Sequence, residues 1–201
     1  SQFSITKLLH STNLFDADEN DLESIFKKQL FFLDDFGVDT SIENLRKQVV
    51  RRVDFSKIIR LPDYLGEADE VIKILHQFNY KPQSEFRFRD YSGGSEGVAI
   101  KFLNDTQGYA IYDKMAEIIS EGFTRQELKY KELYTQGKQR RNALKFEKSL
   151  QRKDSLEALV RRRLKTDKKN DFYLDEILNK DLARDILLDE FNSIFNASAV
   201  G

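Results

Sequence analysis

Basic side chains are concentrated in one stretch of the chain, from Arg125 to Lys169. This stretch holds sixteen Lys and Arg against six Asp and Glu, a local net charge of about +10. The rest holds seventeen Lys and Arg against twenty-eight Asp and Glu, so the whole chain carries only −1. Ammonium and guanidinium groups at this density can contact successive phosphates, and arginine can hold one phosphate through two parallel hydrogen bonds. The charge segregation therefore predicts contact with an anionic partner.

The basic stretch is expected to form one long helix, or a pair of helices, over about 125–165. Thr124 and Glu127 have the spacing of a capping box, which marks a helix start. Gly137 is the point at which a single helix would divide. Apolar residues are sparse between 135 and 155, so this helix could bury little of its surface. We expect it to be ordered and largely exposed.

A second group of cations lies on a predicted β-hairpin over about 85–102. Phe86 and Phe88 alternate with Arg87 and Arg89, and a glycine-rich loop and a second alternating run follow. Alternation with a period of two is typical of strands. A basic hairpin can lie along a phosphate backbone. The alternative is an edge hairpin whose charges block unwanted strand pairing.

The candidate partner-binding residues are the cations of these two regions. In a helix, those spaced by three or four residues would share a face. The full set is Lys138, Arg140, Arg141, Lys145, Lys148, Arg152, Lys153, Arg161, Arg162, Arg163 and Lys165, with Arg87 and Arg89 from the hairpin. Three explanations remain open: contact with nucleic acid, contact with an acidic protein surface, or an exposed helix whose charges confer solubility or dock on acidic parts of the same chain.

The patterns in the rest of the chain predict a mainly α, essentially all-α protein, in which that hairpin is the one small β element. Apolar residues at helical spacing predict helices over about 19–35, 41–53, 64–79, 106–120 and 171–195. Three helices followed by a hairpin is similar to the order of a winged helix-turn-helix, so the N-terminal part could be winged-helix-like. The predicted domains are a helical core with the β-hairpin over 1–122 and the long basic helix with the acidic amphipathic C-terminal helix over 123–201, and one continuous domain is the alternative.

No catalytic motif, metal site or cofactor site is predicted. The chain contains no cysteine, which excludes thiolate ligands and cysteine nucleophiles, and its two histidines are not at metal-ligand spacing. Carboxylate pairs are too numerous in so acidic a chain to indicate acid–base chemistry. No apolar run approaches the roughly 18 residues that span a bilayer. We expect a soluble, cytoplasmic protein without a membrane partner, with the nucleus or a virion left open.

The composition and patterns together predict a non-enzymatic binding protein. The expected partner is nucleic acid, DNA or RNA, held through its backbone by the basic helix. The alternative is a structural or adaptor subunit of a larger assembly, such as a viral one, in which the helix docks on an acidic protein surface. A homo- or hetero-oligomer is compatible with either function, because oppositely charged regions of one chain can associate head to tail.

Overall fold

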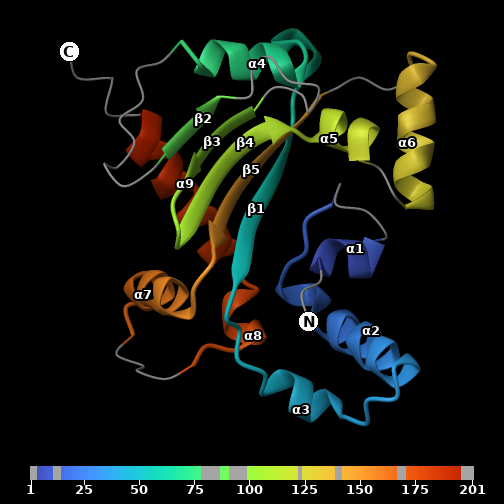
Figure 1. Ribbon diagram of the computed structural model, residues 1–201, viewed down its shortest axis with the longest axis vertical. Helices are drawn as coiled ribbons and strands as arrows, with labels where there is room; N and C mark the ends of the chain where they lie inside the picture. The colour runs from blue at the N-terminus through green and yellow to red at the C-terminus, as the bar shows by residue number, and fades with distance from the viewer. Residues whose placement is uncertain are drawn as a thin grey trace.

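A five-stranded antiparallel sheet lies at the centre of the protein (Figure 1). In this computed structural model, the residues described are 4–10, 15–77, 87–90, 99–121, 124–138, 142–166 and 171–195. The strand order is β1-β5-β4-β3-β2, and every neighbouring pair is antiparallel. The strands are β1 Val53–Arg60, β2 Arg87–Asp90, β3 Ala99–Leu103, β4 Gln107–Asp113 and β5 Ala143–Leu150.

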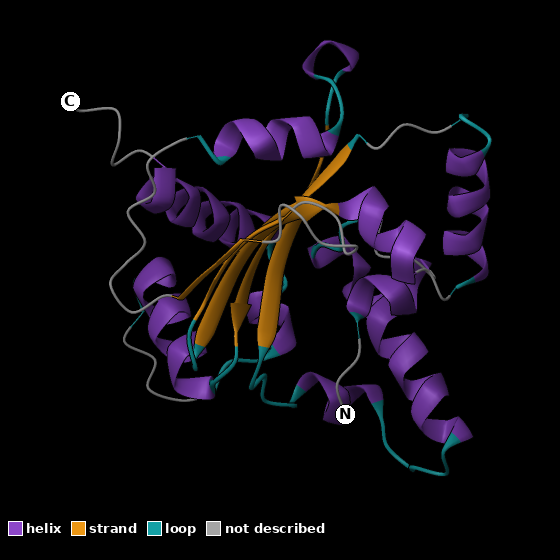
Figure 2. Ribbon diagram, turned by 45° about the horizontal axis from the view of Figure 1, so that its top comes forward, coloured by secondary structure: helices purple, strands orange, loops and turns teal. Residues whose placement is uncertain are grey.

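Helices surround this sheet (Figure 2). The α-helices are α1 Ile5–His10, α2 Leu22–Asp35, α3 Ile42–Arg46, α4 Ala68–Leu75, α5 Lys114–Glu121, α6 Arg125–Thr135, α7 Lys153–Leu164, α8 Leu174–Ile177 and α9 Lys180–Phe195. Two short 3₁₀ helices are η1 Glu19–Asp21 and η2 Asp63–Leu65. No helix in the described ranges is both long and apolar enough to cross a membrane.

One face of the sheet, the helix-covered face, carries the main core. Tyr109 and Ile111 of β4 and Leu144 of β5 pack with residues of α4 and α9. Leu150, further along β5, packs with residues of α7 and α9. Figure 1 shows α9 crossing behind the strands. Because alternate residues of a strand point to opposite faces, these apolar positions assign every second residue to this core.

The opposite face of the sheet is largely polar. Residues directly opposite each other in antiparallel strands share a face, so the register defines its members. We call it the polar face. Its members in β1, β3, β4 and β5 are Asp54, Ser56, Ile58, Arg60, Ala99, Lys101, Leu103, Gly108, Ala110, Tyr112, Ala143, Lys145, Glu147 and Ser149. At one end it is covered by α5, where Met115 and Ile118 pack against Ala143 of β5.

The predicted mainly α, all-α fold is wrong, because the protein is built on a five-stranded sheet and two of the regions predicted to be helical contain strands. Residues 41–53 form only the short helix α3, and β1 begins at Val53. The first half of the region 106–120 is β4, and only its second half is α5. A strand between α3 and α4 also removes the helix order of a winged helix-turn-helix.

The predicted long basic helix is also wrong. Its sequence forms α6, then β5, then α7, and β5 pairs with β1 on one side and β4 on the other. Leu144, Phe146 and Leu150 recur at even spacing, which suits a strand with one face in the core. Tertiary pairing in the sheet therefore overrides the helical interpretation of residues 143–150.

Several local predictions are confirmed. Thr124 caps α6 in a capping box with Glu127. The two predicted hairpin strands pair as β2 and β3, with Arg89 opposite Lys101, although they form the edge of a larger sheet. The loop 91–98 of this hairpin lies outside the described residues. Strands from both predicted domains share the sheet, because β5 lies between β1 and β4.

Candidate functional site

The predicted binding residues do not lie along one surface. Figure 1 shows α6 and α7 on opposite sides of the sheet. Around α6, Lys138 follows the helix, and Arg140 and Arg141 lie outside the described residues. Strand β5 carries Lys145 and Lys148, and strand β2 carries Arg87 and Arg89. Helix α7 carries Lys153, Arg161, Arg162 and Arg163, with Arg152 just before it and Lys165 just after it. The basic stretch is therefore divided among three places.

Lys148 lies inside the protein rather than on a binding surface. Its side chain is 1% exposed, and its Nζ lies 3.0 Å from Oε1 of Glu190 on α9. Burial lowers the pKa of Lys148, the Glu190 carboxylate opposes that shift, and Arg162 adds to it. Such a pair joins β5 to α9 and leaves no ammonium available to a partner.

Cations of α7 are largely engaged with carboxylates of the same chain. Arg161 lies 3.2 Å from Glu157, and Lys153 contacts both Glu157 and Asp171. Arg163 pairs with Asp189 of α9. The three consecutive arginines also stand in the last turn of α7, where the helix dipole favours positive charge. Stability of the fold therefore accounts for much of this basic run.

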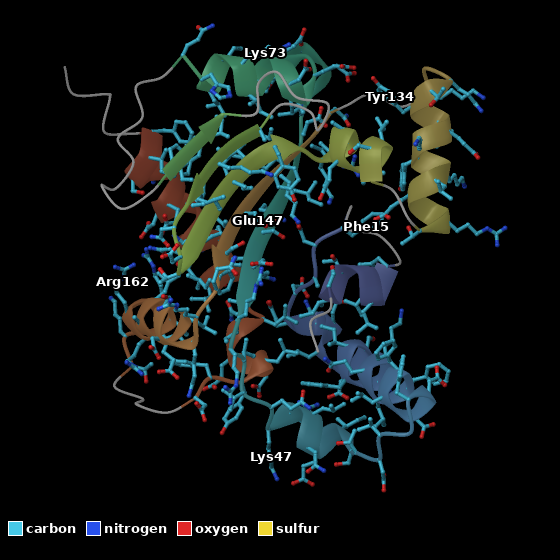
Figure 3. The ribbon with its side chains drawn as sticks, in the orientation of Figure 1. Phe15, Lys47, Lys73, Tyr134, Glu147 and Arg162 are labelled. Atoms are coloured by element: carbon cyan, nitrogen blue, oxygen red, sulfur yellow. The ribbon has the colours of Figure 1, made fainter. Side chains whose placement is uncertain are left out.

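A polar cluster on the polar face joins β4 to β5. Tyr112 and Lys145 are directly opposite each other in the register, and Glu147 lies two residues further along β5. The Tyr112 hydroxyl donates a hydrogen bond to Oε2 of Glu147 at 3.2 Å. The Lys145 Nζ lies 3.0 Å from the same oxygen. Figure 3 labels Glu147 on the sheet, away from α6 and α7.

Lys114 brings a second ammonium group to this cluster. It is the first residue of α5, and Asp113 caps that helix by accepting a hydrogen bond from the backbone N–H of Ala116 at 2.9 Å. The Lys114 side chain is 2% exposed and pairs with Glu117. Its Nζ lies 5.9 Å from the centroid of the Tyr112 ring, and Nζ of Lys145 lies 5.8 Å from that centroid. Two ammonium groups thus lie near one aromatic ring, at cation–π distance.

The electrostatics of the cluster show how strongly its groups are coupled. Burial lowers the pKa of Lys114, Glu117 opposes this effect, and Lys145 reinforces it. Burial alone would raise the pKa of Glu147, but Lys145, Tyr112 and Lys114 together lower the pKa below its ordinary value. Burial and the nearby carboxylates raise the pKa of Tyr112, which keeps its hydroxyl protonated. Perturbed groups gathered at one place are typical of functional sites.

Further cations lie on the polar face around the cluster. Lys101 of β3 stands opposite Ala110, and Ala110 stands opposite Glu147. Arg60 of β1 is exposed and pairs in register with Ala143. Arg89 of β2 is opposite Lys101 in register, which brings a predicted binding position to this row of the sheet. The cations come from widely separated parts of the sequence.

The cluster can donate hydrogen bonds to an anion, whereas a metal site is not indicated. Ammonium groups supply three donors each, Glu147 pairs with Lys145, and Glu117 of α5 pairs with Lys114. Asp54 of β1 adds one more carboxylate to the face, in register with Ser149. Among the described residues, no group of three or more His, Asp and Glu could hold a metal ion.

Comparisons with family models, curated proteins and solved structures found no match.

Sequence reasoning missed Tyr112, Lys114 and Glu147 as members of a site. Tyr112 and Lys114 lay in a region predicted to be wholly helical, and Glu147 lay in the predicted basic helix. The alternation of Leu144 and Phe146 with charged residues was an available signal for a strand. That signal is weak because Lys148 occupies the next core position.

Proposed function

We propose that this chain is a non-enzymatic nucleic-acid-binding protein that contacts the phosphate backbone with its polar face. The observation that carries the proposal is the convergence of cations from β1, β3 and β5 on one side of the sheet. Arg60, Lys101 and Lys145 are its described members, and the buried Lys114 lies beneath them, paired with Glu117. Arg89, and Arg87 beside it, follow on the neighbouring strand β2.

The physical support comes from preorganisation. Lys145 is 12% exposed and its ammonium is already held by Glu147, so binding would immobilise little additional side chain. Phosphates can accept hydrogen bonds from lysine while the carboxylates keep these ammonium groups in place. Sheet faces that carry aromatic and basic residues are a common platform for single strands. The site would contact the backbone more than the base edges, with little sequence preference. For such a protein we propose a cytoplasmic location.

The proposal is tested by comparing two pairs of substitutions on different surfaces. Lys101→Gln with Lys145→Gln removes two cations of the polar face, and Arg162→Gln with Lys165→Gln removes two exposed cations at the end of α7. Fluorescence anisotropy would measure the affinity for a labelled single-stranded DNA, the matching RNA and a duplex. We expect the polar-face pair to weaken binding by at least about tenfold and the α7 pair by less than about twofold, because only the first pair removes phosphate contacts.

A second variant protects this test against loss of folding. Arg60→Gln with Lys101→Gln leaves the cluster of Tyr112, Lys145 and Glu147 intact, and it should also weaken binding by about tenfold. The circular dichroism spectrum and melting temperature of each variant would be checked. The proposal would be abandoned if the unmodified protein bound no nucleic acid at low salt, or if the α7 pair lost as much affinity as the polar-face pairs.

A further inference from the structure

A group of aromatic side chains is exposed at the C-terminal end of α2. The exposed fractions are 70% for Phe31, 50% for Phe32 and 71% for Phe36, and Val38 beside them is 46% exposed. The rings of Phe32 and Phe36 lie 4.9 Å apart between centroids. We call these four residues the α2 patch. Single exposed apolar residues are ordinary, but exposed aromatic rings in contact, such as Phe32 and Phe36, mark an interaction surface.

Three acidic residues lie among and beside the residues of the α2 patch, and one exposed cation, Lys27, lies one turn before Phe31. Asp34, Asp35 and Asp39 are exposed, and none of them forms an ion pair with a residue in the described ranges. Asp34 and Asp35 are in the last turn of α2, where the helix dipole disfavours negative charge. A basic partner would offset that cost. The α2 patch and its aspartates therefore favour a binding partner that presents an apolar side chain with positive charges beside it.

The outer surface of α6 has the complementary chemistry. Leu128 is 47% exposed. Arg125, Lys129 and Lys131 are exposed on the same helix, Lys138 follows it, and Glu132 adds one exposed carboxylate. We call Leu128 and these four cations the α6 surface, whose net charge remains positive with Glu132 included. Figure 1 shows α6 and α2 apart in one molecule, with α1 between them, so their complementary charges point to two copies of the chain.

We propose that the α2 patch of one copy binds the α6 surface of a second copy, head to tail. Phe32 and Phe36, whose rings are in contact, would cover Leu128, and the aspartates would face the lysines and arginine. Two α2 patches could not pair as well with each other, because each would bring three carboxylates against three. The contact is heterologous and leaves one free patch and one free α6 surface at the ends, so assemblies can grow beyond a dimer.

Sedimentation velocity in the absence of nucleic acid tests this self-association. We expect the mean mass to rise with protein concentration at about 0.05 M salt and the association constant to fall at least about tenfold at about 0.5 M, since salt screens the charged rim. The control variants are Tyr64→Ser, an aromatic side chain 85% exposed elsewhere, and Arg51→Glu with Arg52→Glu. These controls should associate like the unmodified protein.

Mixing two variants tests the head-to-tail arrangement itself. Phe31→Ser with Phe36→Ser removes the patch, and Lys129→Glu with Lys131→Glu reverses the α6 surface. Each variant alone should be monomeric. Their equimolar mixture should form a dimer that does not grow further, because it retains one intact patch and one intact α6 surface.

Three results would overturn the proposal. The first is an unmodified protein that stays monomeric at all concentrations in low salt. The second is a mixture of the two variants that associates no more than either variant alone. The third is self-association that survives in either variant. Survival in the α6 variant alone would instead indicate that two α2 patches pair. None of these results bears on nucleic-acid binding, because the polar face uses different residues.

Discussion

At the scale of single residues, two lysines three positions apart in β5 have different roles. Lys145 lies on the polar face beside Tyr112, whereas Lys148 lies in the core beside Glu190. In a helix, a spacing of three residues places side chains on one face, but in a strand it places them on opposite faces. The sequence patterns predicted both lysines as partner contacts, and only knowledge of the strand separates them.

Substitution of Glu147 tests the electrostatics of the polar cluster. Glu147→Gln should lower the free energy of unfolding at pH 7 by on the order of 1–3 kcal/mol, because it weakens hydrogen bonds from a lysine and a tyrosine. The folded-state pKa of Glu147 is lowered, so its stabilisation exists above the ordinary glutamate pKa of about 4.3 and is lost as the pH falls through the lower folded value.

The measurement is urea unfolding of the unmodified protein and the variant between pH 7 and pH 3. The difference between them should be constant down to about pH 5 and should shrink below the ordinary pKa. A difference that did not change with pH, or that grew as the pH fell, would contradict the ionised state assigned to Glu147.

At the scale of elements, local signals in the sequence predicted what local interactions determine. The cap at Thr124, the helix α2 and the pairing of β2 with β3 all depend on neighbours in sequence. Strands β1, β4 and β5 could not be assigned in the same way, because they are stabilised by pairing between segments far apart in the chain. The site was missed for the same reason, since its residues meet only when the sheet forms.

The ion pair between β5 and α9 provides a test of the packing on the helix-covered face. Lys148→Met should destabilise the protein by about 3 kcal/mol, because the Glu190 side chain, only 16% exposed, would lose the ammonium that pairs with it. Adding Glu190→Leu should recover most of that loss, since two apolar residues can replace a buried pair. Urea unfolding would measure both variants. A single variant as stable as the unmodified protein, or a double variant less stable than the single one, would refute the buried arrangement.

At the scale of the whole molecule, the charge segregation of the sequence is partly neutralised by the fold. Lys148 and Arg163 from the basic stretch pair with Glu190 and Asp189 of the acidic C-terminal helix. Other cations remain exposed at α6 and at the end of α7, and Lys145 joins a face built from several strands. The basic stretch is thus a source of separate structural and surface contacts rather than one binding arm.

Mapping the contact of nucleic acid by NMR tests the proposed function most directly. The unmodified protein, labelled with ¹⁵N, would be titrated at low salt with a short single-stranded oligonucleotide. We predict that the largest amide shifts occur at Lys101, Tyr112 and Lys145 and around them, and that they decrease as salt is added, since phosphate contacts dominate the binding. Shifts confined to α7 or α6, or shifts that do not respond to salt, would contradict the assignment of the polar face as the nucleic-acid interface.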